Sequence, residues 1–243
     1  MHPLGHTSVG KRVYPAAEAT GILRRYRDLA AHAPRELTTN FILTSADLTI
    51  TVLWSGTADG AETAVAPFGA LGITKSTSIG EMTFLDLQRM YDDQLAWNRR
   101  YCAKGGYLQQ IDDRAIDHIV DCVASAPTLD ANIYVLQLGG AVCDIDEDAT
   151  PYTGRAAGYY WIVGSGWDHK ADDERFMAWS RMAAGRMAGI SMRGNYVNEQ
   201  GDFGKEIALG AYGERKYSRL AKLKARYDPA NLFRLNQNIE PKP

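Results

Sequence analysis

Two apolar segments separated by a short turn constrain the fold of this chain most strongly. Leu37–Leu43 and Leu48–Leu53 are each predicted to be a strand, and Ser45 to Asp47 between them are typical of a turn. The second segment alternates apolar and polar residues, as a strand with one buried face does. Strands that follow each other this closely pair in antiparallel fashion.

Apolar residues at helical spacing predict helices on both sides of this pair. The predicted helices are Glu18–His32, the segment from an N-cap at Thr83 to Met90, Asp112–Val123, Asp172–Met187 and Tyr217–Arg226, with a weaker one at Ala61–Leu71 that contains Pro67. Further strands are predicted at Asn132–Leu138, with a continuation over Ala141–Ile145, and at Gly158–Trp167.

The order of these elements indicates the fold class. Strands come in neighbouring pairs rather than in strict alternation with helices, which favours an α+β domain with helices on one face of an antiparallel sheet. The 243 residues allow one large domain or two small ones. We find no linker, low-complexity segment or long internal repeat.

Composition and charge argue against several classes of function. A net charge of -2 gives no electrostatic reason to expect nucleic acid or an acidic membrane surface as partner. No apolar run approaches the roughly 18 residues of a membrane helix, and the first residues lack the pattern of a signal peptide. Cys102, Cys122 and Cys143 are far apart, which favours buried free thiols and a cytoplasmic protein.

Metal and phosphate sites are not expected. The five histidines are scattered without metal-ligand spacing, and no glycine-rich phosphate loop occurs in the sequence. Asp144, Asp146, Glu147 and Asp148 form an acidic cluster without the glycine and further oxygen ligands of a calcium loop. We therefore expect this cluster to be a solvated turn.

Two aromatic segments are candidates for a small-molecule site. In the segment Tyr159–Trp167, strand alternation places Tyr159, Trp161 and Val163 on one face and Tyr160 on the other. The second segment is Asn195–Glu199. Composition alone favours core and turn residues, and an aromatic-lined pocket with a few polar groups is the alternative.

The C-terminal segment is unusually apolar for a chain terminus. Asp228 and Pro229 end the preceding helix, and Leu232, Phe233 and Ile239 then stand among polar residues together with Leu235. Either these side chains dock on the core of their own domain or they dock on another domain.

Short motifs in a fixed order point to one family. They are Tyr14-Pro15, residues 34–38, Tyr107-Leu108 with residues 111–116, Gly139–Val142, Asp148 to Thr150 with Arg155, Tyr196–Asn198, Tyr212-Gly213, Arg219-Leu220 and Tyr227–Ile239. This ordered set resembles the substrate-binding domain and C-terminal segment of the berberine-bridge-enzyme-like FAD-linked oxidases. Residues 1–5 (Met-His-Pro-Leu-Gly) resemble the end of that family's FAD-binding domain.

The resemblance implies a division of the chain and a cofactor. Residues 1–12 would be a remnant of the FAD-binding domain, residues 13–195 the substrate-binding domain and residues 196–243 the family's C-terminal segment. The sequence has neither family motif for covalent flavin attachment. FAD would therefore be held by a missing or separate FAD-binding domain or subunit, and the chain would be truncated, split or stand-alone and inactive alone.

The resemblance also implies catalytic and cofactor-binding residues. Members of the family transfer a hydride from an alcohol, a sugar or a secondary metabolite to the flavin while a base takes the substrate proton. Tyr196 and Glu199 would be catalytic, with Glu199 as the base, although Glu199 can equally be a solvated turn residue. Asn198, Asn236 and Gln237 would contact the cofactor or its domain.

The substrate side of the implied site departs from the family. Tyr160, Trp161 and Val163 would line the face toward a small-molecule substrate, and neither Trp161 nor Val163 can transfer a proton. Gly154 stands where the family has a histidine. These changes keep a second hypothesis open, in which the chain is a non-redox small-molecule-binding domain or a degenerate partner domain.

Overall fold

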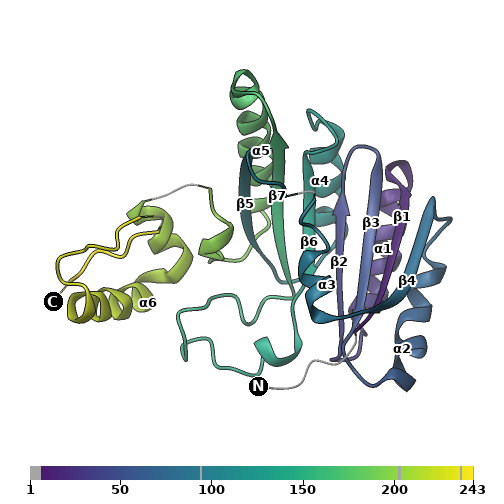
Figure 1. The fold of residues 1–243 in the computed structure, drawn as a ribbon, viewed down its shortest axis with the longest axis horizontal. Coiled ribbons are helices and arrows are strands. Elements are labelled where there is room, and N and C mark those ends of the chain that lie inside the picture. The colour runs from purple at the N-terminus through teal and green to yellow at the C-terminus, as the bar shows by residue number, and fades with distance from the viewer. Residues whose placement is uncertain (1–6, 94, 202–203, 236, 243) are drawn as a thin grey trace.

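A seven-stranded antiparallel sheet forms the centre of the computed structural model, which describes residues 7–93, 95–201, 204–235 and 237–242 (Figure 1). The strands are β1 (Thr7–Pro15), β2 (Leu37–Leu43), β3 (Asp47–Trp54), β4 (Ser76–Met82), β5 (Arg100–Leu108), β6 (Asn132–Gln137) and β7 (Tyr159–Trp167). Their order across the sheet is β4-β1-β3-β2-β6-β7-β5. Each pair of neighbours is antiparallel, which confirms the predicted fold class.

Helices cover one face of this sheet. The described helices are α1 (Ala19–Ala30), α2 (Ala58–Val65), α3 (Phe84–Arg89), α4 (Asp113–Ala124), α5 (Asp173–Ala188) and α6 (Lys205–Tyr227). Short 3-10 helices lie at Ala16–Glu18, Ala66–Ala70, Gly140–Val142, Lys170–Asp172 and Val197–Glu199. In Figure 1, α1, α4 and α5 lie behind the sheet, whereas α6 stands apart from it beside the C-terminal segment.

The main core lies between the sheet and α1, α4 and α5. Helix α4 begins at Asp112, whose side chain accepts the backbone N–H of Ala115 at 2.8 Å. Its buried stripe includes Ile116 and Ile119, which join the same apolar cluster as Phe41 of β2. Full burial of one such side chain contributes about 1.5–3 kcal/mol to the free energy of unfolding, so this face holds the domain together.

Several predicted elements are confirmed. β2 and β3 pair through the predicted turn, with Leu43 opposite Leu48. Thr83 caps α3 in a reciprocal arrangement, in which its hydroxyl accepts the N–H of Asp86 and the Asp86 carboxylate accepts the N–H of Thr83. The predicted helix over residues 61–71 instead divides at Pro67 into α2 and a 3-10 helix, because proline cannot donate the hydrogen bond of a continuing α-helix.

One strand prediction is wrong and three strands are not predicted. Ala141–Ile145 does not extend β6, because Gly140 has a φ of 60° and turns the chain into a 3-10 helix. The strands without a sequence signal are β1, β4 and β5. Strands β4 and β5 are the sheet edges, and β4 is polar and almost fully exposed, so an alternating apolar pattern does not mark it.

The last helix is longer than predicted. α6 begins at Lys205 rather than near Tyr217, and it is kinked at Gly213, where φ is 71°. Its residues Ala208, Tyr217 and Ala221 form a small apolar cluster of their own. We call α6 together with the described residues of 228–242 the C-terminal arm.

The apolar tail does not dock on the core of this domain. Phe233 and Leu235 are 82% and 86% exposed, and Leu232 is 75% exposed. The Asp228 carboxylate accepts the N–H groups of Leu232 and Phe233 at 2.8 and 3.0 Å, so the backbone is held while the apolar side chains face solvent. Ile239, in contrast, packs against the small cluster of α6.

The predicted domain boundary after residue 12 falls inside β1. That strand pairs with β3 from Ser8 to Pro15 without interruption. The division of the chain into three parts stays a prediction.

We expect replacement of Tyr26 by Phe to destabilise the fold by about 1–3 kcal/mol, because it leaves a buried acceptor unsatisfied. The Thr39 hydroxyl donates to Gln137 Oε1 at 2.8 Å, so Tyr26 must donate to Thr39 across their 2.7 Å contact. Urea unfolding measures the change. The exposed Tyr101→Phe variant is the control, with a change within about 0.5 kcal/mol; equal losses would contradict the argument.

Candidate functional site

Strand β7 sends its side chains alternately to the two faces of the sheet. Tyr159, Trp161 and Val163 belong to the helix-side core, whereas Tyr160 and Ile162 lie on the opposite face. We call this opposite surface the open face. The hypothesis that Trp161 and Val163 line a substrate face together with Tyr160 conflicts with this geometry, since adjacent strand residues point in opposite directions.

Trp161 and Val163 have structural surroundings instead. Trp161 is 2% exposed and its indole N–H donates to Ser191 Oγ at 2.9 Å. Val163 is fully buried among the residues that pack under the helices. Their inability to transfer protons therefore says little about the chemistry of the open face.

Tyr160 is one of the buried tyrosines of the open face. Its ring lies 5.2 Å from that of Tyr107, its cross-strand neighbour, and 6.2 Å from that of Tyr196, which meets it edge-on. Tyr160 is 6% exposed, and its hydroxyl has no hydrogen-bond partner among the described residues. Burial raises the pKa of Tyr160, and the charge of Glu199 raises it further. The hydroxyl is thus neutral, and it is a buried polar group without a hydrogen-bond partner among the described residues.

Gly105 makes room for this hydroxyl. A Cβ atom at Gly105 would lie 2.3 Å from the Tyr160 hydroxyl oxygen and 2.9 Å from the carbonyl oxygen of Trp161. Gly105 was not predicted as a site residue; the Gly105-Gly106 pair within a strand is the signal that marks such a close approach.

The second part of the site is the turn at residues 195–199. The Glu199 N–H donates to the carbonyl of Tyr196 at 3.0 Å, and the Asn198 side-chain amide donates to the Tyr196 hydroxyl at 2.8 Å. Glu199 is half-buried, and this burial raises the pKa of its carboxyl. Glu199 in turn raises the pKa values of Tyr134 and Tyr160, so its charge acts on the open face. A carboxylate in this setting can accept a proton from a ligand.

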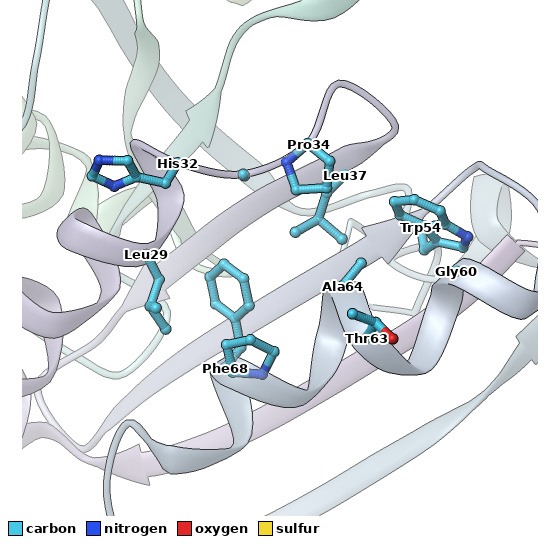
Figure 2. Close-up of a pocket in the computed structure, with 11 residues that line it drawn as sticks. Leu29, His32, Pro34, Leu37, Trp54, Gly60, Thr63, Ala64 and Phe68 are labelled. Carbon is cyan, nitrogen blue, oxygen red and sulfur yellow. The ribbon is translucent and has the colours of Figure 1, made fainter.

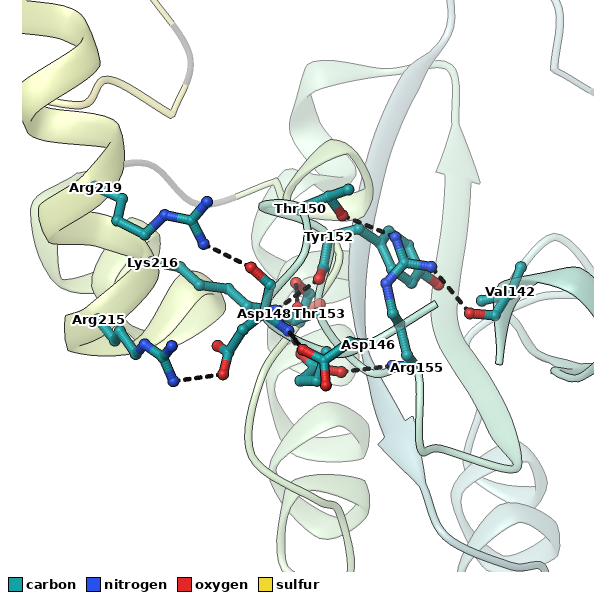
Figure 3. Close-up of polar contacts among 12 residues, drawn as sticks. Val142, Asp146, Asp148, Thr150, Tyr152, Thr153, Arg155, Arg215, Lys216 and Arg219 are labelled. Atoms are coloured by element: carbon teal, nitrogen blue, oxygen red, sulfur yellow. Dashed lines mark hydrogen bonds and ion pairs between the residues drawn. The ribbon is translucent and has the colours of Figure 1, made fainter. Parts of the chain in front are cut away.

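The loop between β6 and β7 supports this turn (Figure 3). The ring of Tyr152 lies 5.9 Å from that of Tyr196, and the Thr153 hydroxyl donates to the carbonyl of Asn195 at 3.1 Å. The acidic cluster of the loop is not merely a solvated turn, because Glu147 and Asp148 form ion pairs with α6.

The structure brings together four of the residues proposed from the sequence and separates the others. Tyr160, Tyr196, Asn198 and Glu199 lie on or beside the open face. Gln237 lies on the C-terminal arm, and Asn236 is outside the described residues. Tyr107 and Tyr134 also belong to the open face and were not predicted; the catalytic, substrate and cofactor roles of all these residues stay predictions.

A separate apolar pocket lies on the helix-covered side of the sheet (Figure 2). It has a volume of about 600 Å³ and lies between the end of α1, strands β2 and β3, and the region of α2. Its walls include Leu29, Leu37, Trp54 and Phe68. The carboxylate and tyrosines described above are not among its lining residues, so we do not assign the chemistry to it.

The cysteines differ in their surroundings. Cys122 is buried, Cys102 is half-buried and Cys143 is exposed, and all three are free thiols. The prediction that all are buried is therefore wrong for Cys143, which lies in the β6–β7 loop. Within the described part of the chain, no three His, Cys, Asp or Glu side chains gather as a metal site would require.

The helices of the protein were compared with the length and hydrophobicity that a membrane span requires. None of those in the described segments combines the length and apolar character needed to cross a bilayer.

Known proteins are similar to this chain in sequence. Residues 195–240 match the family model described as "Berberine and berberine like". An FAD-linked oxidoreductase of Dictyostelium discoideum is 24% identical over 99% of this chain and 53% of its own length. One of Pyricularia oryzae is 29% identical over 85% of this chain and 44% of its own length. The chain thus spans about half the length of these relatives.

Solved structures show the same fold. The wild-type BBE-like 1 protein of Physcomitrella patens has a TM-score of 0.84 at 15% identity, with 100% of this chain and 56% of that protein covered. Aclacinomycin oxidoreductase has a TM-score of 0.81 at 18% identity, with 99% and 56% covered.

The seven-stranded antiparallel sheet with helices on one face is the α+β fold of these BBE-like structures. The C-terminal segment thus matches the berberine-like family model, and the chain as a whole is similar to FAD-linked oxidoreductases over about half of their length.

We expect Gly105→Ala to displace the Tyr160 ring and to destabilise the domain by about 1–3 kcal/mol, as overpacking does. Near-ultraviolet circular dichroism detects a change in the environment of the Tyr160 ring. Chemical denaturation measures the change in the free energy of unfolding. Gly80→Ala in β4 is the matched control, because a Cβ there meets nothing within 4 Å. A spectrum unchanged in Gly105→Ala would contradict the close approach.

Glu199→Gln is expected to change the pH dependence of stability. Because burial raises the folded pKa of Glu199 above its ordinary value, the unfolded chain loses this proton first as pH rises. The stabilising contribution of the protonated carboxyl is complete below the unfolded pKa and is lost as pH rises through the folded pKa. The variant lacks this loss, so its stability relative to wild type should increase from pH 4 to pH 7.

Urea unfolding at several pH values measures this difference. The exposed Glu62→Gln variant on α2 serves as control. A Glu199→Gln curve parallel to wild type would show that Glu199 is solvated.

Proposed function

We propose that this chain is the substrate-binding and C-terminal portion of an FAD-dependent oxidoreductase that oxidises a small alcohol, sugar or secondary metabolite. The observation that carries the proposal is the C-terminal arm, whose Leu232, Phe233 and Leu235 are exposed while Asp228 holds their backbone. Apolar side chains held in this way are typical of an interface. We infer that they dock on a flavin-bearing domain encoded elsewhere or upstream.

The residues of the open face suit the cofactor. Tyr196 offers aromatic surface to a flat ring system, and Tyr160, which packs edge-on against it, has a buried hydroxyl without a hydrogen-bond partner among the described residues. The sequence contains no glycine-rich phosphate loop, so this chain would cover the flavin ring while another domain holds the rest. When bound, the flavin supplies the acceptor for the substrate's hydride.

Glu199 is the proposed general base. Its raised pKa brings a carboxylate closer to the range in which it accepts a proton near neutral pH. Asn198 fixes the hydroxyl of Tyr196, and Tyr196 contacts the ring of Tyr160. In this arrangement Tyr160 orients the substrate oxygen and Glu199 receives its proton. Asn198, Asn236 and Gln237 would face the cofactor or its domain.

The domain assignment follows from this proposal. Residues 13–195 would bind substrate, residues 196–243 would form the family's C-terminal segment, and residues 1–12 would be the end of a FAD-binding domain.

A second function is favoured by one observation. On the open face, Ile162 and Gly164 follow Tyr160 along β7 and cannot exchange protons. A non-redox binding domain, or a degenerate partner of an intact homologue, would have such a face.

The visible absorbance of the protein purified undenatured from its native host distinguishes the two functions. Flavin bands with a co-purifying polypeptide, or with a longer form of this chain, would support the oxidoreductase. A colourless single chain of this length would favour the non-redox domain.

We expect the combined substitution of Leu232, Phe233 and Leu235 by Ser to abolish co-purification of the flavin-bearing part in a split assembly. The physical reason is the loss of the apolar surface that the partner would bury. Ile73→Ser is the control, because Ile73 is 83% exposed but lies before β4, outside the arm. Retention of flavin in the triple variant would exclude the arm as the interface.

Glu199→Gln tests the base in the flavin-containing assembly. Glucose and chitooligosaccharides are the probes, since one solved relative is an allergen with glucose dehydrogenase activity and another is a chitooligosaccharide oxidase. If either bleaches the flavin anaerobically, the variant should slow bleaching by about 10²–10⁴-fold. Rates that match those of Glu62→Gln would exclude Glu199 as the base.

A further inference from the structure

Polar contacts hold the C-terminal arm to the rest of the domain. The apolar cluster of α6 consists of Ala208, Tyr217 and Ala221 with neighbours on the arm itself, and it is separate from the main core. The part of α6 after the kink at Gly213 meets the acidic β6–β7 loop (Figure 3). The arm is therefore anchored mainly by charge and hydrogen bonds.

Lys216 is the buried member of this anchor. It is 5% exposed, and its ammonium group donates to Glu147 Oε1 at 2.5 Å and to the carbonyl oxygen of Tyr152 at 2.7 Å. The other carboxylate oxygen of Glu147 accepts the backbone N–H of Arg155 at 2.9 Å. Glu147 thus ties Lys216 to the far end of the same loop. A buried ammonium group needs such partners, because desolvation of an unpaired charge is unfavourable.

The contacts continue from this loop to the candidate site. The ring of Tyr152 lies between the guanidinium of Arg155, 5.1 Å from its centroid, and the ring of Tyr196, 5.9 Å away. The Thr153 hydroxyl donates to the carbonyl of Asn195. Two consecutive loop residues therefore contact the turn that carries Glu199, and Lys216 binds the backbone of the first of them.

We propose that Lys216 is a positioning residue, which couples the C-terminal arm to the turn at residues 195–199 through Glu147 and Tyr152. The inference rests on the proposed function in giving Glu199 a catalytic role and the arm a docking partner; the coupling itself does not. Because the same arm presents Leu232, Phe233 and Leu235, docking of a partner on the arm stabilises the placement of Tyr196 and Glu199. The site would then be fully ordered only in the assembled protein.

Lys216→Met tests the coupling in the chain as it stands. The apolar stem is kept and the ammonium group is lost, so the loop no longer holds the turn. Backbone amides of residues 195–200 should exchange with solvent about tenfold faster. Arg215→Met is the matched control, because Arg215 is exposed and pairs with Asp148 of the same loop. In the Arg215→Met variant, the amide hydrogens of residues 195–200 should exchange as fast as in wild type.

A second measurement separates positioning from a simple change of charge. Titration of the carboxyl ¹³C chemical shift of Glu199 measures the pKa of this residue. The same carboxylate is one of the groups that raise the pKa values of Tyr134 and Tyr160. Loss of a cation alone would raise the pKa of Glu199, whereas a loosened, more hydrated turn lowers it. We expect Lys216→Met to lower it and Arg215→Met to leave it unlowered.

Glu147→Gln provides an independent variant should Lys216→Met fail to fold. It should accelerate exchange in the turn in the same direction. The proposal is overturned if the turn keeps wild-type exchange in these variants, or if Arg215→Met loosens it as much as they do. Both readouts need no flavin, so a negative result here is separate from a negative result for the proposed function.

Discussion

Burial of one sheet face under α1, α4 and α5 is the constraint on which the rest of the structure depends. Every second side chain along a strand is buried in that core, so the side chains between them must point to the opposite face of the sheet. On β7 this rule places Trp161 in the core and Tyr160 on the open face. The open face therefore follows from the way the domain is stabilised, and it is where the tyrosines and Glu199 meet.

The two surfaces outside the core are built from different interactions. The open face combines aromatic packing with a half-buried carboxylate. Burial raises the pKa of Glu199, and burial together with the charge of Glu199 raises the pKa of Tyr160. The C-terminal arm is attached by Lys216 and Glu147 and exposes its apolar side chains. An arm anchored by polar contacts but ending in apolar ones is suited to dock on another domain, in agreement with a chain that spans half of its relatives.

Local patterns in the sequence predicted much of the scaffold. The pairing of β2 with β3, the capped start of α4 and the cap at Thr83 all depend on residues close in sequence. The edge strands β4 and β5 did not follow from the sequence, because β4 is exposed and β5 contains paired glycines in place of an alternating pattern.

The sequence by itself determined the fold class and the apolar character of the C-terminal segment, because both are carried by the order and spacing of residues along the chain. Its ordered short motifs carried the family resemblance. The tertiary structure decided which side chains share a face. It separated Trp161 and Val163 from Tyr160, placed Gly105 beside the Tyr160 hydroxyl, and made the still exposed Glu147 the partner of the buried Lys216. These contacts join residues up to 69 positions apart, and no local pattern encodes which distant groups packing will bring together.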